Sequence, residues 1–525
     1  MLQQSHANYR GYRTAGIRLN EELLGELEFR PTQYFDVTLD SIHAFDKAHV
    51  VMLIEQNLIS RSDGRRILAQ IRQMEALGVA ETRRHARGGA HSCEQYLIQT
   101  LGEDIGGQVN LGRSSGDLGE VSRRITMREK IIDAANDLNN FREQMIELSE
   151  RHIGVVFPAQ SFLQHAQPTS LGHWFGMGAT TLGRDFERLL SLYSRINQSP
   201  AGAGILTGSD FPVDRHRTSL LLGFDRTIPN TFDAIMSHDV IIEAASVIGI
   251  IWSNLARLAD DLELWLSSDV RFIDVPDRFC DTSSVMAQKR NPNLPQQVKA
   301  QSVKAMGAVT MSFVAERGAS GQPIMERFEA ERLLWELFDD LTPVGKNLAL
   351  MLQAMQPDVD RMRSAALDGW STASDLTGLI VRKTELSWRT AHQITGIVVR
   401  LSDERGAGPR DVTPELINEA AELYFNRPLL VTAQEIAQTL DPVGSVKRRL
   451  VYGGPARVVQ ERAIEELRGE LTSDVRRLNQ HKYRLNESAR LLEAAIDKIL
   501  APAVGDGRKL GDGDDTRNGS VFDHH

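Results

Sequence analysis

The stretch from Thr231 to Val275 constrains the fold more than any other part of the sequence. It contains no proline and a single glycine, Gly249. Its apolar residues recur at intervals of three and four, which is the spacing of one face of an α-helix. They are Ile235, Met236, Val240, Ile241, Ala245, Ile248, Ile251, Leu255, Leu258 and Leu262. About 35 residues of this stretch as one helix would extend roughly 50 Å, which predicts a long helical bundle.

Three other segments repeat this pattern. Helices are predicted from Gly119 to about His152, from Gly172 to about Asn197, and onward from about Leu294. The prolines near Leu294 lie at the start of the predicted helix, where a helix tolerates them. Few segments alternate polar and apolar residues as strands do, so we expect no βαβ nucleotide-binding domain.

Glycine, proline and polar residues separate the predicted helices. Breaks include the segment Ser199–Pro212, and a shift near Gln356 to Ser364 leads into a smaller helical region with a loop at Glu404–Thr413. The sequence after Leu500 is polar and rich in glycine and aspartate. It has no apolar surface to bury, so we predict that residues 501–525 form a disordered tail.

Composition excludes several classes of protein. The net charge is −10 with a pI near 5.8, which does not suggest a nucleic-acid-binding protein. The two cysteines, Cys93 and Cys280, belong to no metal-binding or disulfide pattern. No apolar run is long enough for a membrane span, and the N-terminal residues lack the apolar core of a signal peptide. We therefore predict a soluble, cytoplasmic protein.

The segment Asp281–Asn293, DTSSVMAQKRNPN, is the first that could carry chemistry. Ser283 and Ser284 precede Lys289 and Asn291 in a short stretch between helices. Hydroxyls, an ammonium and an amide suit carboxylate binding with proton abstraction beside it. The alternative interpretation is a surface turn followed by a helix cap.

The segment Asn110–Glu120, NLGRSSGDLGE, is the second. Arg113, Ser114 and Ser115 lie where a long helix is predicted to begin, and backbone N–H groups there favour an anion. Simple N-capping by Ser114, Ser115 or Asp117 would also explain these residues.

The segment Ser161–Trp174, SFLQHAQPTSLGHW, is the third. It places Gln164, His165, Gln167 and His173 around a proline. A histidine in such a segment is more often structural than catalytic. These residues alone therefore do not distinguish a catalytic role from a structural one.

Taken together, the three segments resemble a known family. GRSSGD, QHAQP and SSVMAQKRNP occur in the order and at about the spacing of the signature regions of the aspartase/fumarase superfamily. They are most similar to the argininosuccinate lyase forms TGRSRNDQ, THLQxAQP and GSSxMPQKxNP. The segments SPAGAGILTGSDFPVDRHR and LDPVGSVKRRLVYGGPARVVQERAI also resemble that family, and the likeness covers roughly residues 10 to 500.

The resemblance implies an all-α fold with three helical domains. Residues 1–112 would form an N-terminal helical domain, 113–365 the central long-helix bundle and 366–500 a C-terminal helical domain. Four subunits of such a chain would form a homotetramer with a 20-helix core, and each active site would take residues from three chains. No cofactor or metal is implied, and the expected partners are a dicarboxylate substrate and fumarate.

The resemblance also assigns roles to residues. Ser283 would be the general base that removes the Cβ proton of an aspartyl unit. Lys289 and Asn291 would hold the carboxylate where negative charge develops, with help from Ser284. Arg113 and Ser114 match the GRS of the first motif, so they would bind substrate. Ser161 stands where the family has threonine, so the resemblance implies a catalytic role for it, and Gln164 matches the family glutamine.

Several family residues are replaced in this sequence. An arginine and an asparagine of the first motif are Ser115 and Gly116, although Ser115 keeps a hydroxyl that could bind substrate. The family histidine after the threonine is Phe162; His165 and His238 are candidates to compensate. Ser237 is kept from the SDRDF motif. The substrate-binding segment AYNxDxQxxK has only IMERFEAER as a counterpart, with Glu329 and Arg332 in place of glutamine and lysine.

These departures leave three functions open. The first is a carbon–nitrogen lyase that releases fumarate from an N-substituted aspartate other than argininosuccinate; the Arg-Ser-Ser run resembles the ethylenediamine-disuccinate lyase branch. The second is argininosuccinate lyase proper. The third is a catalytically silent structural homologue, which the lens crystallins of this family make conceivable. A cycloisomerase, the other chemistry of the superfamily, is less favoured by the AQK and GRSS segments.

Overall fold

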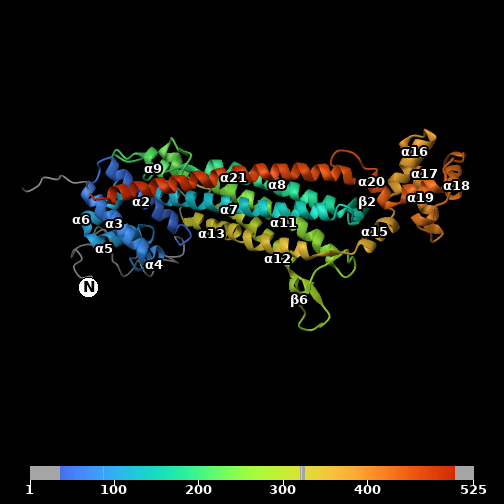
Figure 1. Cartoon of the computed structure of the whole chain (residues 1–525), viewed down its shortest axis with the longest axis horizontal. Helices are drawn as coiled ribbons and strands as arrows, with labels where there is room; N and C mark the ends of the chain where they lie inside the picture. The colour runs from blue at the N-terminus through green and yellow to red at the C-terminus, as the bar shows by residue number, and fades with distance from the viewer. Residues whose placement is uncertain (1–35, 87, 320, 322–324, 503–525) are drawn as a thin grey trace, which may run out of the picture.

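The computed structural model describes residues 36–502 except 87, 320 and 322–324, and the described chain is all-α, as predicted. A long helical bundle occupies the middle, with smaller groups of helices at its two ends (Figure 1). Apart from Ala501 and Pro502, the tail predicted to be disordered lies outside the described residues.

The bundle contains the predicted long helices. Its helices are α7 (Ser115–Arg151), α8 (Leu171–Ile196), α11 (Asp239–Leu266), α12 (Asn293–Ala315), α13 (Met325–Asp339), α14 (Leu341–Ala354) and α21 (Arg457–Leu500). Their core includes the buried side chains of Phe175, Phe186 and Trp252. Ser170 begins α8 by accepting a hydrogen bond from the backbone N–H of His173 at 3.1 Å, as an N-cap residue does.

The prediction of one helix of about 35 residues within Thr231–Val275 is wrong. The stretch forms α10 (Thr231–Met236) and α11, and α11 ends at Leu266. Between the two helices, the hydroxyl and the carbonyl of Ser237 both accept hydrogen bonds from Arg124 of α7, at 2.9 and 3.4 Å. This tertiary contact, which no local pattern reveals, is made where the chain leaves the helical conformation.

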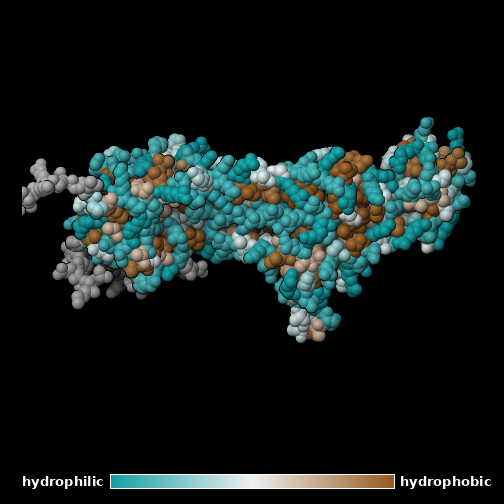
Figure 2. Space-filling model, in the orientation of Figure 1, coloured by the Kyte–Doolittle hydropathy of each residue, from teal (hydrophilic) through white to brown (hydrophobic). Residues whose placement is uncertain are grey.

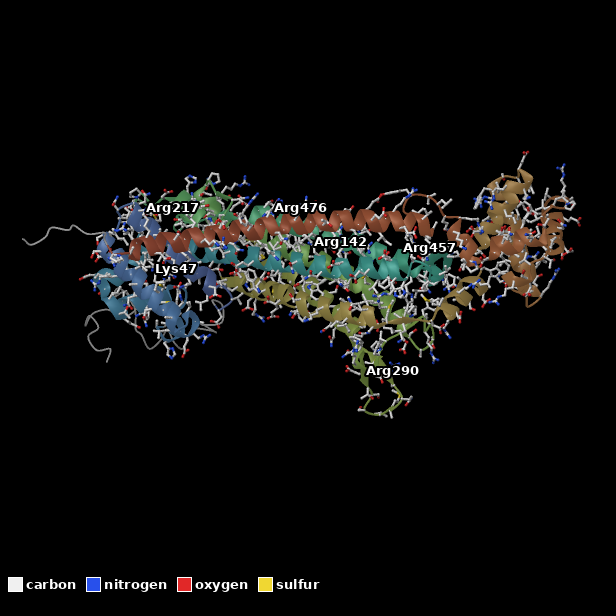
Figure 3. The ribbon with its side chains drawn as sticks, in the orientation of Figure 1. Lys47, Arg142, Arg217, Arg290, Arg457 and Arg476 are labelled. Carbon is white, nitrogen blue, oxygen red and sulfur yellow. The ribbon has the colours of Figure 1, made fainter. Side chains whose placement is uncertain are left out.

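The last helix, α21, has 44 residues and runs along the whole bundle (Figures 1 and 3). Arg142 of α7 donates to Asp474 at 2.6 Å, and Lys47 of α2 donates to Glu493 at 2.6 Å. Leu471 belongs to the core of the bundle. The predicted domain boundaries at residues 112, 365 and 500 stay a prediction. By sequence, α21 belongs to the predicted C-terminal domain, residues 366–500, but it packs against the central bundle.

Smaller helices pack at the two ends. The N-terminal group consists of α2 (Leu39–Glu55), α3 (Arg61–Leu77), α4 (Val79–Ala86), α5 (Ser92–Leu101) and α6 (Glu103–Gly106), with α9 (Arg215–Leu221) beside it. The C-terminal group consists of α16 (Ala373–Thr384), α17 (Trp388–Glu404), α18 (Pro414–Phe425) and α19 (Ala433–Leu440). Helices α15 (Val359–Asp368) and α20 (Pro442–Lys447) connect that group to the bundle.

The strands of the described chain form four two-stranded sheets. Strands β1 (Val156–Ser161) and β2 (Gln164–Ser170) make an antiparallel hairpin, as do β6 (Cys280–Thr282) and β7 (Arg290–Pro292). The short pairs β3 (Gln198–Ser199) with β4 (Arg226–Thr227) and β5 (Ile273–Asp274) with β8 (Gln356–Pro357) join loops. Within residues 36–502, apart from positions 87, 320 and 322–324, the strands form no βαβ nucleotide-binding sheet, as expected.

Helix α11 is, by length and composition, apolar enough to cross a membrane. Buried positions make up 56% of the window that meets this test, and Ile248 and Trp252 lie in the bundle core. Packing within the bundle therefore accounts for the apolar composition of α11. Further apolar side chains reach the surface of the bundle (Figure 2), among them Ile250 on α11 and Val303, Met306, Phe313 and Val314 on α12.

Candidate active site

Arg113, the candidate residue just before α7, has its side chain in a buried, hydrogen-bonded environment. The Arg113 guanidinium donates to Asp46 at 2.7 Å and lies 4.9 Å from the centre of the Phe45 ring, with 2% of the side chain exposed. Arg83 also donates to Asp46, at 2.5 Å. Burial alone would raise the pKa of Asp46, but the two arginines outweigh it and hold that pKa at about 2. Arg113 thus belongs to a buried ion pair.

Ser114 is the N-cap of α7. Its Oγ accepts from the backbone N–H of Gly116 at 3.1 Å, and its own N–H donates to Asp117 at 2.9 Å. The capping interpretation of this motif is thereby confirmed for Ser114. Ser115, the first residue of the helix, is exposed. The capping box of Ser114 and Asp117 satisfies N–H groups at this end of α7, and the exposed Ser115 lies beside it.

Ser237 lies between α10 and α11, and its neighbour His238 lies beside a group of buried charges that the sequence did not reveal. Within this ionic cluster, which we define as Glu120, Arg123, Glu316, Arg327 and Glu331, Arg123 pairs with Glu120 and with Glu331. The guanidinium of Arg327 donates to Glu316 at 3.2 Å. Its members come from α7, α13 and the end of α12, so they meet only in the folded chain.

Burial perturbs the ionic cluster and its neighbour His238. It raises the pKa of Glu316 to about 7, against the opposing effect of Arg327. It also lowers the pKa of His238 to about 4, although Glu120 lies 3.6 Å from Nε2. His238 is therefore neutral at physiological pH, which makes it a weak candidate to replace the family histidine as a proton donor.

Arg332 neighbours the ionic cluster in sequence but points away from it. Its side chain is half exposed, and it pairs with Glu336 at 3.4 Å and with Glu329 at 3.6 Å on the surface of α13. Both contacts are of the helix-surface type, which contributes little to stability. Arg332 is thus accessible to a ligand.

Ser161 and Gln164 lie at the tip of the β1–β2 hairpin, opposite each other in the register. Both are exposed, and the turn between them consists of Phe162 and Leu163. His165, the other candidate to replace the family histidine, is exposed on β2 and packs against Gly369. Beneath the tip, a hollow of about 420 Å³ is lined by residues that include Gln160, Gln167, His173 and Trp174.

The loop between β6 and β7 carries Ser283, Ser284 and Lys289, and it projects from the side of the bundle (Figure 1). The Oγ of Ser283 accepts two backbone N–H groups, from Val285 at 3.2 Å and from Met286 at 3.0 Å. Ser284 and Lys289 are exposed, whereas Ser283 is partly buried. Two N–H groups directed at one oxygen stabilise negative charge on it, which is what a serine base requires.

The base of this loop is fixed more firmly than its tip. Asn291 pairs with Asp281 across the hairpin, and Arg290 donates to Asp277 at 2.8 Å and to the carbonyl of Val275 at 2.6 Å (Figure 3). The loop therefore presents Ser283 and Lys289 from an anchored base.

The three motifs do not meet within one chain. Ser115 begins α7, and the β1–β2 hairpin follows the other end of that helix, whose 37 residues extend about 55 Å. The β6–β7 loop projects from the bundle between those ends (Figure 1). A site that uses all the candidate residues would therefore need more than one copy of the chain.

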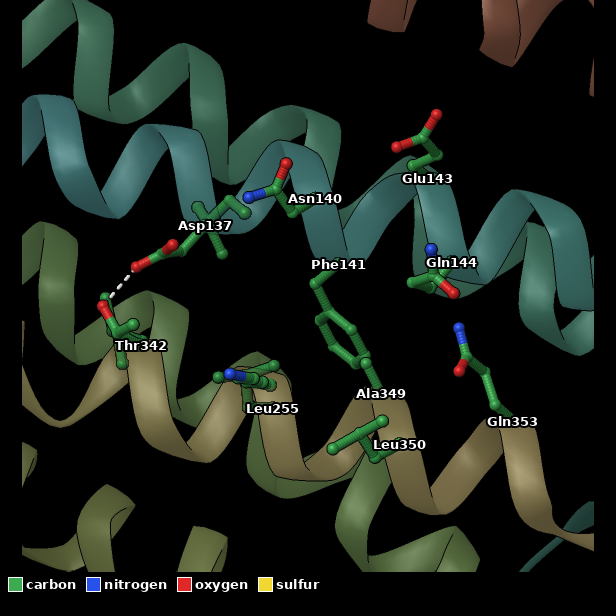
Figure 4. A pocket seen from close by; sticks show the side chains of 14 residues that line it. Asp137, Asn140, Phe141, Glu143, Gln144, Leu255, Thr342, Ala349, Leu350 and Gln353 are labelled. Carbon is green, nitrogen blue, oxygen red and sulfur yellow. Dashed lines mark hydrogen bonds between the residues drawn. The ribbon is translucent and has the colours of Figure 1, made fainter.

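A cavity within the bundle lies apart from these motifs. It measures about 360 Å³ and is lined by α7, α11 and α14, including Asn140, Phe141 and Gln353 (Figure 4). Asp137 at its edge accepts a hydrogen bond from Thr342. In the described part of the chain, no group of three or more His, Cys, Asp or Glu side chains is arranged to hold a metal ion.

Comparison with known proteins gives a consistent picture. The family described as lyase matches residues 55–307, and the family described as argininosuccinate lyase C-terminal matches residues 370–447. The argininosuccinate lyase of Methanosarcina acetivorans is 32% identical over 458 residues, which cover 87% of this chain and 92% of that enzyme.

Solved structures agree with these matches. EDDS lyase in complex with formate has a TM-score of 0.82 at 26% identity, covering 89% of this chain and 93% of that one. A variant of EDDS lyase with bound fumarate has a TM-score of 0.81 at the same identity and coverage. A class II fumarase from Schistosoma mansoni, with a TM-score of 0.64 at 15% identity over 78% of this chain and 90% of that one, shares the fold.

Proposed function

The chain belongs to the argininosuccinate lyase family of the aspartase/fumarase superfamily, and on that premise we propose that it is a carbon–nitrogen lyase acting on an N-substituted aspartate. The reaction breaks the Cβ–H bond and then the Cα–N bond of the aspartyl unit. The electron pair of the Cα–N bond leaves with the amine, which takes up a proton, and fumarate remains. Fumarate bound to a variant of EDDS lyase supports fumarate as the shared product.

The geometry of Ser283 carries this proposal. A serine hydroxyl is a poor base in water and becomes a useful one only where its charged form is stabilised. The two N–H groups on its Oγ supply such stabilisation. In the proposed mechanism Ser283 takes the Cβ proton, while Lys289 and Asn291 hold the carboxylate that gains negative charge, assisted by Ser284.

The remaining candidates would bind the rest of the substrate. The start of α7 offers Ser114, Ser115 and the positive end of the helix dipole to a carboxylate. Arg113 is hydrogen-bonded to Asp46. It would therefore act by holding the first motif in place and by adding positive charge near the substrate carboxylate. Ser161 and Gln164 would complete the carboxylate contacts, Ser161 in the catalytic position of the family threonine. Ser237 and Arg332 are proposed as further substrate contacts.

We propose that the active site is assembled in a homotetramer. The three motifs lie at separate places along a bundle whose α7 alone extends about 55 Å. Exposed apolar residues on α11 and α12, such as Ile250 and Val303, supply surface that helices of other copies would bury in a 20-helix core. A cytoplasmic location follows from the same assignment to soluble metabolic lyases.

Residue replacements support a substrate other than argininosuccinate. Ser115 and Gly116 stand where the family has arginine and asparagine, and Glu329 pairs with Arg332 where the family binds substrate. The loss of one charged hydrogen bond costs about 1.5–3 kcal/mol, a factor of about 10 to 100 in affinity. Likeness to EDDS lyase supports an amine of the aminopolycarboxylate type.

Argininosuccinate lyase proper is the second candidate. The 32% identity to the Methanosarcina acetivorans enzyme, over 87% of this chain, favours it. The third candidate, a silent structural homologue, is favoured by Phe162 in place of the histidine and disfavoured by the retention of Ser283, Lys289 and Asn291.

The test runs the reaction toward addition. Purified full-length protein is incubated with fumarate and one amine at a time, arginine and ethylenediamine included, and the loss of fumarate is followed by its ultraviolet absorbance. We expect loss with an amine other than arginine, and a decrease of about 10²- to 10⁴-fold in Ser283→Ala. Ser473→Ala, an exposed serine on α21, is the matched control and should retain the rate.

Each other outcome selects another candidate. Fumarate loss with arginine alone, together with growth of an arginine auxotroph that carries the gene, would establish argininosuccinate lyase proper. A folded oligomer that consumes fumarate with no amine of a broad panel would favour the silent homologue.

A further inference from the structure

The turn of the β1–β2 hairpin is strained and apolar. Phe162 and Leu163 have φ values of 54° and 58°, in the left-handed region that two-residue hairpin turns normally fill with asparagine or glycine. A residue other than glycine, asparagine or aspartate in this region has a backbone energy cost. Their side chains are 97% and 69% exposed, so contacts within the chain do not offset this cost. A conformation of this kind persists when something outside the hairpin holds it.

A second exposed apolar surface lies beside the start of α7. We define the α7-end patch as Ile205, Phe211 and Phe232, which are 59%, 42% and 41% exposed. Leu206, next to Ile205, has a φ of 83°, so this loop is strained as well. Ile205 lies against Gly116: a Cβ on that glycine would come within 2.9 Å of Ile205 Cδ1. The patch therefore directly adjoins the first motif.

The hairpin turn and the α7-end patch cannot meet within one chain. They lie near opposite ends of α7, about 55 Å apart along its axis. The candidate residues Ser161 and Gln164 flank the turn, and Ser114 and Ser115 flank the patch. Contact between the turn of one copy and the patch of another would bring these four residues together and bury apolar surface on both sides.

We propose that Phe162 of one copy packs on the α7-end patch of another and forms, with Ile205, an apolar wall that recognises the alkyl part of the departing amine. This inference rests on the proposed lyase function and adds a substrate class to it. A phenyl ring donates no hydrogen bond to a carboxylate, so it is unsuited to the fumarate half of the substrate. Carbon atoms of the amine substituent are its natural partner.

Side-chain size near the patch supports this assignment. Gly116 and Ser115 are small, and the space that larger polar side chains would occupy is bordered by Ile205. A wall of Phe162 and Ile205 favours contact with the methylene carbons of the amine substituent, which an aminopolycarboxylate amine also carries, and offers no hydrogen-bond acceptor for a guanidinium.

The first experiment compares n-butylamine with arginine in fumarate addition. We expect Phe162→Ala to lower kcat/KM for n-butylamine by about 10- to 100-fold, mainly through KM, and for arginine by less than about 3-fold. Phe162→His should shift the preference toward arginine. Leu430→Ala, which removes a 91% exposed leucine from the C-terminal group, is the matched control and should change neither rate. Equal losses for both amines in Phe162→Ala would overturn the proposal.

The second experiment needs no activity. In a Cys280→Ser background, Leu163→Cys combined with Ile205→Cys should give inter-chain disulfides on mild oxidation, seen as dimers and larger species on a non-reducing gel. Leu430→Cys combined with Ile205→Cys should stay monomeric on that gel. Absence of cross-links in the first pair would overturn the docking. Cross-links in a protein that adds no amine to fumarate would refute the proposed function and the recognition role, while leaving the docking intact.

Discussion

At the start of α7, Arg113 is buried and both Arg113 and Ser114 are already hydrogen-bonded, whereas in the two hairpins Ser161, Gln164, Ser284 and Lys289 are exposed to solvent. Arg113 is held by Asp46 with 2% of its side chain exposed, while Phe162 is 97% exposed and Lys289 makes no side-chain hydrogen bond within the described residues. One part of the proposed site is thus preformed in each chain. In the proposed tetramer, the other parts would take up their working environment only when copies associate.

This difference separates residues whose loss costs stability from residues whose loss costs only activity. A buried ion pair is expensive to break because the remaining charge loses a partner that offset its desolvation. An exposed side chain on a loop contributes little to the free energy of unfolding. The predictions below test this separation.

The largest effect is expected from Arg113. Replacement by alanine leaves the buried Asp46 carboxylate with Arg83 as its one remaining cation in the described structure, so the free energy of unfolding should fall by about 3 kcal/mol. Lys289→Ala should change it by less than about 0.5 kcal/mol. Urea unfolding followed by circular dichroism measures both variants. Equal stability of the two would contradict the contrast between the preformed and the projecting regions.

The contrast also explains what could be predicted from the sequence. Helical periodicity is local, so the bundle and the start of α7 could be predicted, as could capping by Ser114. The Arg113–Asp46 pair joins residues 67 positions apart, and no spacing in the sequence predicts it. The break at Ser237 likewise depends on Arg124 of another helix. The ionic cluster could not be predicted from the sequence, because each of its members taken singly looks like an ordinary surface charge of an amphipathic helix.

The exposed region shows a different limit. The residues of the two hairpins could be assigned to a site by their likeness to a family, and that assignment stays a prediction. Neither the strain at Phe162 and Leu163 nor the exposure of these side chains follows from the sequence, because their partners belong to another copy in the proposed assembly.

The second prediction concerns pH and the ionic cluster. Burial raises the pKa of Glu316 from 4.5 to about 7, so the native state holds this proton more tightly than the unfolded chain does. The stability contributed by the protonated carboxyl is complete below about pH 4.5 and is lost as the pH rises toward 7. Glu316→Gln should remove this dependence. The stability difference between wild type and variant should therefore change by about 2 kcal/mol across that window.

Thermal unfolding of both proteins at a series of pH values tests this point. Parallel curves for wild type and Glu316→Gln would show that the carboxyl keeps an ordinary pKa in the native state. Glu329→Gln is the matched control, because that glutamate lies on the surface of α13 and should leave the pH dependence unchanged.

The smallest effect separates the two adjacent serines of the first motif. Ser114 caps α7 through Gly116 and Asp117, and its replacement by alanine should cost about 1 kcal/mol. Ser115 is exposed and makes no side-chain hydrogen bond within the described chain, so Ser115→Ala should cost less than about 0.5 kcal/mol. If both serines bind a substrate carboxylate, both variants should nonetheless raise KM in fumarate addition. Equal unfolding free energies would show that the cap of α7 is dispensable. A KM change confined to Ser114→Ala would instead assign Ser115 to the surface of the protein rather than to the site.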